Sequence, residues 1–415
     1  MAYTDLTQIQ EKINTHKSDL AANLAAKSVN ANSSETLAVL IGKVKDIEQT
    51  GGGGSGEGSL DWSQITDMSY AFYNAPKIFN FLWPTIKNVS HVTSWNYAFY
   101  AAIKSTQANK ILQDSNIRFD KLDTYMFQNC EYLTGISLAD SITTPKNSMG
   151  NCFSGCTRLK LPVAIKALDC LDKTVDTNLS YAFSSCGSLS NYDGDDVIGD
   201  LTVNSSTMSN IFNGCSNIKS IGNITSLSSN DFVIGGGFSG CNYMEEIGVI
   251  KANSLGAGNG NIFGSCSRLV KINGFEIANQ TTEILTNSGT KMLGSSALSK
   301  LEEALNIPIA YHRYGGTNLG SLTGSASARK PLRRLTFCNS ENGYLNKTYA
   351  KNLDIKYCSF DRDGMLEVFN TIPDASDVNS TSTITITGNP CVRDKTLTEE
   401  DIAIATAKGY VVTTA

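Results

Sequence analysis

The chain has 415 residues, of which 18% are charged, and its formal net charge is −5. This balance excludes a surface built to bind a nucleic-acid backbone or an anionic membrane. No apolar stretch approaches the roughly 18 residues of a membrane-spanning helix, and Met1 to Asp5 lack the basic start and apolar run of a signal peptide. We therefore expect no nucleic-acid partner, no membrane insertion and no Sec export.

The amino-terminal residues 5 to 27 are predicted to form one helix with a narrow apolar stripe at coiled-coil spacing. The stripe residues expected to mediate oligomerisation are Leu6, Ile9, Ile13, Leu20 and Leu24. A second helix follows Ser34, which can cap it. Such a stripe is too thin for burial in a globule. We therefore predict that residues 1 to 50 form a helical foot, meaning a segment that docks on a partner and self-associates, with a trimer favoured. The alternative is a two-helix cap on the domain that follows.

Residues 51 to 59 are rich in glycine and predict a flexible linker. A linker would separate a cap from what it covers, so it favours the docking foot. The sequence Ala21 to Ala31, followed by Ser34 to Leu37, resembles the amino-terminal segment of phage structural and fibre proteins. This resemblance implies docking onto other virion proteins and a virion location, with assembly in the host cytoplasm.

Residues 60 to 300 contain a repeat with a period of about 25 to 30 residues. Its aromatic column consists of Phe72, Phe99, Phe127, Phe153, Phe183, Phe212, Phe238 and Phe263, with Leu293 as a degraded ninth member. A column of small side chains lies three residues later: Ala75, Ala102, Cys130, Cys156, Cys186, Cys215, Cys241, Cys266 and Ser296. An aliphatic residue usually follows three residues after that.

A single repeat of this kind cannot close a core, whereas stacked repeats can bury the phenylalanine of each copy against the next. Each buried ring contributes roughly 1.5 to 3 kcal/mol. Each copy is predicted to hold a short helix or loop with the Phe and Cys, then a strand. The expected fold class is an α/β solenoid, leucine-rich-repeat-like, preceded by the helical foot.

The phrases Met126 to Leu133 and Ile211 to Ile218 resemble the BspA-like class of leucine-rich repeats of bacterial surface antigens. The resemblance covers roughly residues 60 to 300. It implies a curved array with strands on one face, and a binding or adhesive role. The first two copies depart from the pattern, because they have alanine in place of cysteine.

The column cysteines are expected to act as small buried hydrophobes with free thiols, because alanine and serine fill the same column. Disulfides between neighbouring members are the alternative. Cys152 and Cys156 lack a second ligand pair, so no zinc site is expected. The acidic cluster of Asp193, Asp195 and Asp196 is interpreted as a solvated loop and not as a calcium site. No cofactor and no catalytic site are expected, since the three histidines fit no triad or metal phrase.

Aromatic residues gather in the first two repeats and predict a contact surface for a sugar or a protein. The candidate residues are Trp62, Trp83, Trp95, Tyr73 and Tyr100, with Tyr70 and Tyr97 nearby. The alternative is that these rings cap the open end of the stacked phenylalanines.

Residues 301 to 415 are predicted to form divergent repeats and a cap. Strand phrases begin at Leu332, Leu353 and Ile384. A helix capped by Thr398 or Thr396 is expected to run through Lys408, with a final strand at residues 410 to 413. The phrase that begins at Ile384, with the helix after it, resembles the carboxy-terminal unit of phage-encoded repeat proteins.

These features predict a non-enzymatic phage structural protein, a tail or head fibre or decoration, that presents its repeats for binding to a host-surface glycan or protein. A purely structural capsid or tail component without a receptor is one alternative. A bacterial surface adhesin is another, although it would need an export route that the sequence does not show.

Overall fold

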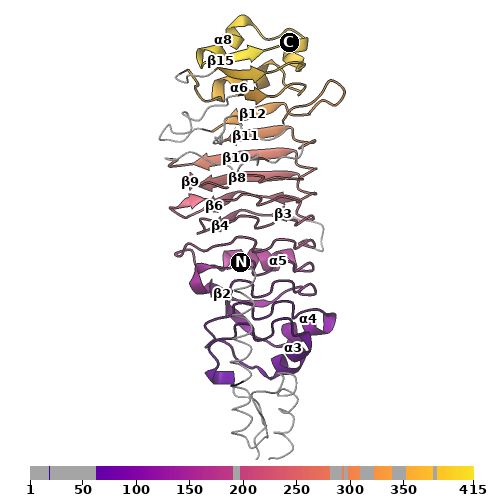
Figure 1. The fold of residues 1–415 in the computed structure, drawn as a ribbon, viewed down its shortest axis with the longest axis vertical. Coiled ribbons are helices and arrows are strands. Elements are labelled where there is room, and N and C mark those ends of the chain that lie inside the picture. Colours follow the sequence, from indigo (N-terminus) through magenta and orange to yellow (C-terminus); the bar gives the residue numbers. More distant parts are fainter. Residues whose placement is uncertain are drawn as a thin grey trace, which may run out of the picture.

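The computed structural model describes Ser18 and residues 62–189, 197–280, 292–293, 298–308, 322–338, 352–376 and 381–415. These residues form an elongated α/β repeat array whose coils stack along one axis (Figure 1). The predicted stripe residues Leu6, Ile9, Ile13, Leu20 and Leu24, the linker at 51 to 59 and the acidic cluster lie outside the described residues.

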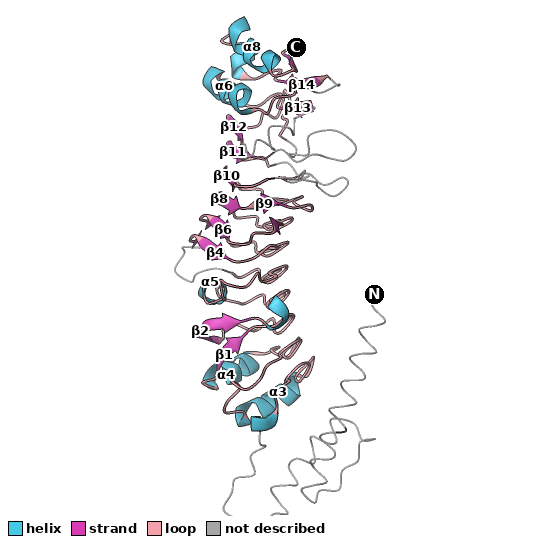
Figure 2. Ribbon diagram, turned by 90° about the vertical axis from the view of Figure 1, so that its left-hand side faces the viewer, coloured by secondary structure: helices cyan, strands magenta, loops and turns pink. Residues whose placement is uncertain are grey.

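The strands pair in parallel, and most belong to one large sheet with the strand order β12-β11-β10-β8-β5-β3, to which β4 and β6 are joined. Figure 2 shows these strands along one side of the array. The bounds of this sheet are β3 (Val197–Ile198), β4 (Leu201–Val203), β5 (Ser220–Ile221), β6 (Ile224–Ser226), β8 (Glu246–Ala252), β10 (Lys271–Ile277), β11 (Glu303–Ile307) and β12 (Arg334–Phe337). The smaller sheets contain β1 (Arg118–Lys121) with β2 (Ser137–Thr143), β7 (Asp231–Phe232) with β9 (Ser254–Leu255), and β13 (Asn352–Asp354), β14 (Ser382–Thr385) and β15 (Tyr410–Thr413).

The described helices are short. Some lie in the repeat coils, where other coils have strands, and the others lie in the carboxy-terminal region. They are α3 (Pro76–Leu82), α4 (Thr106–Asp114), α5 (Leu161–Asp169), α6 (Arg362–Thr371), α7 (Pro390–Arg393) and α8 (Glu399–Ala407), with 3₁₀ turns η1 (Trp62–Gln64), η2 (Trp83–Thr85) and η3 (Pro145–Asn147). The prediction of one strand in every repeat is therefore wrong for the coils that begin at Phe72 and Phe153. Pro76 and Pro162 lie in the first turns of α3 and α5, where proline is tolerated, whereas proline disrupts a strand ladder.

The segment around each phenylalanine is a chain of tight turns. In the coil of Phe99, the amides of Tyr97, Phe99 and Ala101 donate to carbonyls of the next coil at 2.8 to 3.3 Å. The amides between them donate to carbonyls three residues back in the same coil. All three inter-coil bonds point in one direction along the axis, unlike the alternating bonds of a parallel sheet. We call this part of each coil the turn segment.

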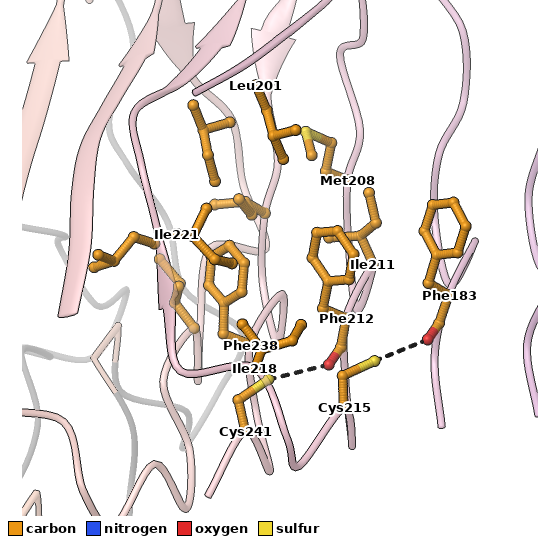
Figure 3. Packing of buried hydrophobic residues seen from close by; sticks show 14 of the residues in the cluster. Phe183, Leu201, Met208, Ile211, Phe212, Cys215, Ile218, Ile221, Phe238 and Cys241 are labelled. Atoms are coloured by element: carbon orange, nitrogen blue, oxygen red, sulfur yellow. Dashed lines mark hydrogen bonds between the residues drawn. The ribbon is translucent and has the colours of Figure 1, made fainter. Parts of the chain in front are cut away.

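The phenylalanines of the turn segments form a continuous ring stack from Phe72 to Phe263. Consecutive ring centroids are 4.8 to 6.2 Å apart and the interplanar angles lie between 3° and 16°. The rings are at most 1% exposed. Figure 3 shows Phe183, Phe212 and Phe238 among the aliphatic side chains that surround them. Offset ring pairs add to the free energy gained by burial.

The cysteine column lies beside the ring stack and links successive coils. Each column thiol donates a hydrogen bond to the carbonyl of the phenylalanine in the preceding coil, with Sγ to O distances of 2.9 to 3.2 Å. Figure 3 shows two of these bonds, from Cys215 to Phe183 and from Cys241 to Phe212. All eleven cysteines are free thiols. An alanine at this position would fill the space less well and would leave the bond unmade.

The carboxy-terminal region adds charged hydrogen bonds and a helix cap to its buried apolar side chains. Arg334 makes a two-bond contact with Glu367 on α6, and Arg362 makes one with Asp401 on α8, at 2.7 to 2.9 Å. Thr398 caps α8 in a capping box with Asp401. The predicted Thr398 cap and the final strand at residues 410 to 413 are confirmed.

Candidate recognition face

Three columns of the turn segments lie toward the surface in most coils, and we call them together the turn face. Their buried members are Ala101, Ser184, Gly236 and Gly264. The column two residues before each phenylalanine contains Tyr70, Tyr97, Tyr125, Asn151, Tyr181, Asn210, Gly236 and Asn261. The column one residue after it contains Tyr73, Tyr100, Gln128, Ser154, Ser184, Asn213, Ser239 and Gly264. The next column contains Asn74, Ala101, Asn129, Gly155, Ser185, Gly214, Gly240 and Ser265. None of these positions carries Lys, Arg, His, Asp or Glu.

Tyrosines dominate the turn face over its first three coils. Tyr97 lies between Tyr70 and Tyr125, with ring centroids 5.0 and 4.3 Å away and interplanar angles of 10° and 7°. In the adjacent column Tyr73 stacks on Tyr100 at 4.6 Å and 13°. Tilted contacts of 5.8 to 6.0 Å join the two columns. These five tyrosines are all partly exposed, so together they form a packed aromatic patch that reaches the surface.

Amide and hydroxyl side chains continue the turn face beyond the tyrosines. Asn129 Nδ2 donates to the Tyr100 hydroxyl at 3.0 Å, and Asn213 Nδ2 donates to Asn210 Oδ1 at 3.3 Å. Asn261 Nδ2 donates to Ser239 Oγ at 3.3 Å. The side chains of neighbouring columns and coils therefore hold one another in place, which lowers the entropy lost when a ligand binds.

The turn face stays uncharged at neutral pH. Burial raises the pKa of the Tyr73 hydroxyl, and the neighbouring Tyr100 raises it further. The phenol is therefore protonated and can donate a hydrogen bond. Since the columns contain no ionisable group except tyrosine, the face offers neutral donors and acceptors only.

Tyrosine is an unusual residue for its backbone position on this face. The residue two before each phenylalanine has positive φ, between 54° and 65°, in every described coil. This left-handed conformation favours glycine and asparagine, which indeed occupy it at Asn151, Asn210 and Gly236. Tyr97 has a φ of 56°, which costs a residue with Cβ roughly 1 to 2 kcal/mol. Ring stacking offsets this cost.

Two of the tryptophans predicted for the contact surface are not at the surface. Trp83 is 0% and Trp95 is 1% exposed, so their prediction as binding residues is wrong. The Trp83 ring packs 5.0 Å from Phe99, and Trp95 packs 5.7 Å from the same ring. The alternative role, covering the end of the ring stack, agrees with this burial and with these ring contacts.

The remaining predicted aromatic residues divide between two places. Tyr73 and Tyr100 lie on the turn face together with Tyr70 and Tyr97. Trp62 is partly exposed in η1, and its Nε1 donates to Thr85 Oγ1 at 3.0 Å. The structure therefore separates Trp62 from the patch that its place in the sequence suggested.

Tyr125, Tyr181 and the asparagines of the turn face were not among the predicted site residues. Tyr181 is 43% exposed. The signal that could have found them is their fixed offset of two residues before each phenylalanine. Nearness in sequence pointed instead to tryptophans that the fold buries.

The column cysteines are buried thiols of low reactivity. Burial raises the pKa of Cys130 and Cys266 to about 12 and raises the pKa of Cys156 and Cys215 still further. A protonated thiol is a poor nucleophile. In the part of the chain that the structure describes, no group of three or more His, Cys, Asp or Glu side chains could hold a metal ion. No described helix has the length and apolar character of a membrane span.

Comparison with known proteins gives little guidance. No protein-family model matches the chain, and no curated protein matches it. Among solved structures, the chain has a weak similarity to a leucine-rich repeat protein from Bacteroides ovatus ATCC 8483, with 16% sequence identity. The match covers 66% of this chain and 78% of that chain, with a TM-score of 0.18. At that score the similarity supports no argument about function.

Proposed function

We propose that the chain is a non-catalytic structural protein of a phage virion, a fibre or decoration of the tail or head, that binds the host surface through its turn face. The observation that carries the binding role is the turn face itself. It is an uncharged surface, mainly of tyrosine, asparagine, serine and glycine, that extends along the coils and whose side chains stack on and hydrogen-bond to one another.

The composition of the turn face matches the residues that antibodies use for recognition. Tyrosine supplies a large amphipathic contact area with few rotatable bonds, and serine, asparagine and glycine supply adaptable hydrogen bonding. Here the tyrosines are already held by stacking on one another. A preorganised surface loses little entropy on binding, so modest contacts give useful affinity.

The non-catalytic part of the proposal is supported by how the chain uses its reactive residues. The column cysteines are buried in the packed core, and their thiols donate hydrogen bonds to backbone carbonyls. Their raised pKa values remove them as nucleophiles at neutral pH. A polysaccharide-degradation assay with purified protein tests this part, and cleavage of any substrate would contradict it.

The virion part of the proposal rests on the sequence of the two ends, which resembles phage structural proteins. The foot is proposed to trimerise through Ile9, Ile13 and Leu20 and to dock on other virion proteins. Light scattering on the intact chain and on a chain without residues 1 to 50 tests self-association. The intact chain should be an oligomer and the shortened one a monomer. If both chains are monomers, the foot does not mediate self-association.

The binding role is tested with purified full-length protein and intact host cells. Saturable attachment is expected, and antibody labelling in electron micrographs should place the protein on the particle. If cells fail to bind the protein while the particle carries it, the chain is a purely structural component, a role for which the continuous ring stack would be sufficient. Labelling on the bacterial surface without particles would favour the adhesin alternative.

A further inference from the structure

We infer that the turn face binds a neutral, linear, hydroxyl-rich glycan that lies along the axis of the array. This inference rests on the proposed binding role and adds the chemical class of the ligand. It follows from three properties of the face: its lack of charge, the covered faces of its tyrosine rings, and its repeat along the coils.

The lack of charge selects against ionic ligands. The three columns carry no basic side chain across eight coils, so a sulfated, phosphorylated or sialylated polymer would lose hydration without gaining an ion pair. Phenol, amide and hydroxyl groups each both donate and accept hydrogen bonds. Sugar hydroxyls have the same dual character and pair with such groups without any charge.

The arrangement of the rings decides which part of each tyrosine a ligand meets. Both faces of Tyr97 are covered, by Tyr70 at 5.0 Å and Tyr125 at 4.3 Å. Tyr73 and Tyr100 each cover one face of the other. An aromatic side chain of a protein partner that needs an open ring face cannot stack on Tyr97. These tyrosines are nevertheless partly exposed, and a phenol hydroxyl can both donate to and accept from the hydroxyl groups of a sugar.

The repeat of the turn face suits a polymer better than a compact ligand. Successive coils are spaced by the distance between stacked rings, 4.8 to 6.2 Å. This spacing is comparable with the advance per residue of an extended hexose chain. A linear glycan along the axis would meet mainly tyrosines on the first three coils and mainly amide, hydroxyl and glycine positions on the later ones. Each additional contact is an intramolecular event that raises the overall affinity.

The inference is tested on an array of immobilised oligomers of neutral hexoses and N-acetylhexosamines, with sulfated and sialylated oligomers of the same lengths. The full-length protein should bind neutral oligomers, more tightly as they lengthen, and binding should change little between low and high salt because no counterions are released. Binding restricted to the anionic oligomers, or to none of the oligomers, would overturn the inference.

The double variant Tyr97→Asn with Tyr100→Ser locates the contact, because asparagine and serine already occupy these two columns in other coils. It should keep the fold and lose at least about tenfold in glycan affinity, as expected when a cluster of central aromatic contacts is removed. The matched control is Tyr243→Asn, at a tyrosine that is 48% exposed and lies outside the turn face. Equal affinity of the double variant and the control would contradict the assignment.

Host cells separate failure of this inference from failure of the proposed function. Periodate treatment of the cells, which oxidises sugars, should abolish attachment, and protease treatment should not. The reverse result would overturn the glycan assignment and leave host binding intact. Cells that never bind the protein would overturn both.

Discussion

The coils from Phe72 to Phe263 and the region from β11 to β15 share one buried apolar core but differ in the contacts that are added to it. In the first region, stacked rings, thiol-to-carbonyl bonds and turn-segment amides join neighbouring coils. In the second, Arg334 with Glu367 and Arg362 with Asp401 join strand to helix and helix to helix.

Charged side chains on neighbouring strands of the large sheet mark the change from the first kind of contact to the second. From β8 onward these side chains alternate in charge, with Glu246 beside Lys271 and Glu303 beside Arg334 at 3.6 and 3.8 Å. The turn segments contain no such charges at their surface columns. Because apolar and backbone contacts join the turn segments, one long face stays neutral, and this is the face that we propose for recognition.

The largest effect is expected from breaking the ring stack at its middle. Phe183→Ala should lower the free energy of unfolding by about 3 to 5 kcal/mol, because it removes a ring that is 0% exposed and leaves a cavity between Phe153 and Phe212. Chemical denaturation monitored by circular dichroism measures it. Phe81→Ala, at a ring that is 41% exposed, is the control and should cost much less. Similar losses in the two variants would refute the role of the stack.

A smaller loss is expected from the cysteine column. Cys215→Ala should cost about 1 to 2 kcal/mol, because it removes a buried sulfur and its bond to the Phe183 carbonyl. Cys170→Ala is the control, since Cys170 is only partly buried and lies outside the column. The two variants are compared by thermal denaturation, and equal shifts in Tm would show that the column bond contributes nothing.

Acid should affect the two regions in opposite directions. The hydrogen bond from Arg362, with backbone help from Thr398, lowers the pKa of Asp401. The ionised Asp401 therefore contributes fully to stability above the ordinary pKa of aspartate. This contribution is lost as the pH falls through the lowered pKa of Asp401. Burial raises the pKa of Asp123 despite backbone hydrogen bonds from Trp95 and Thr124, so its ionised form opposes folding and acid relieves that cost.

Hydrogen exchange, corrected for intrinsic rates, measures this difference. Between pH 7 and about pH 3, below the ordinary pKa of aspartate, protection should fall in α8 relative to the coil of Asp123. Asp401→Asn should remove most of the pH dependence in α8. Protection that falls uniformly along the array would contradict the difference between the regions.

The smallest effect on stability is expected at the turn face. Tyr97→Asn loses the ring contacts with Tyr70 and Tyr125. It also replaces a tyrosine in the left-handed backbone conformation with asparagine, which adopts that conformation at a lower cost. The two changes oppose each other, so the free energy of unfolding should change by no more than roughly 1 kcal/mol. Calorimetry checks this, and a loss comparable with that of Phe183→Ala would mean that the tyrosines are structural.

The sequence predicts the ring stack and the cysteine column because both depend on residues at fixed offsets. It also predicts the cap of α8, since Thr398 and Asp401 have the spacing of a capping box. It does not predict that Pro76 and Pro162 begin helices, because an aliphatic pair is compatible with either a helix or a strand.

The candidate site was predicted only in part. Tyr73 and Tyr100 were found because they are aromatic and close together in sequence, but the same reasoning selected Trp83 and Trp95, which the fold buries. Trp83 and Trp95 are buried because they pack on Phe99, a contact that no local pattern of side chains reveals. The neutral columns emerge only when the coils are aligned on their phenylalanines.

The central claim is that the turn face, and not the array as a whole, is the binding surface. The most direct test compares attachment to host cells of the intact protein, the variant with both Tyr97→Asn and Tyr100→Ser, and the control Tyr243→Asn, all with unchanged circular dichroism. The account predicts that the double variant loses at least about tenfold in apparent affinity while the control binds like the intact protein. Equal attachment of all three proteins would contradict it.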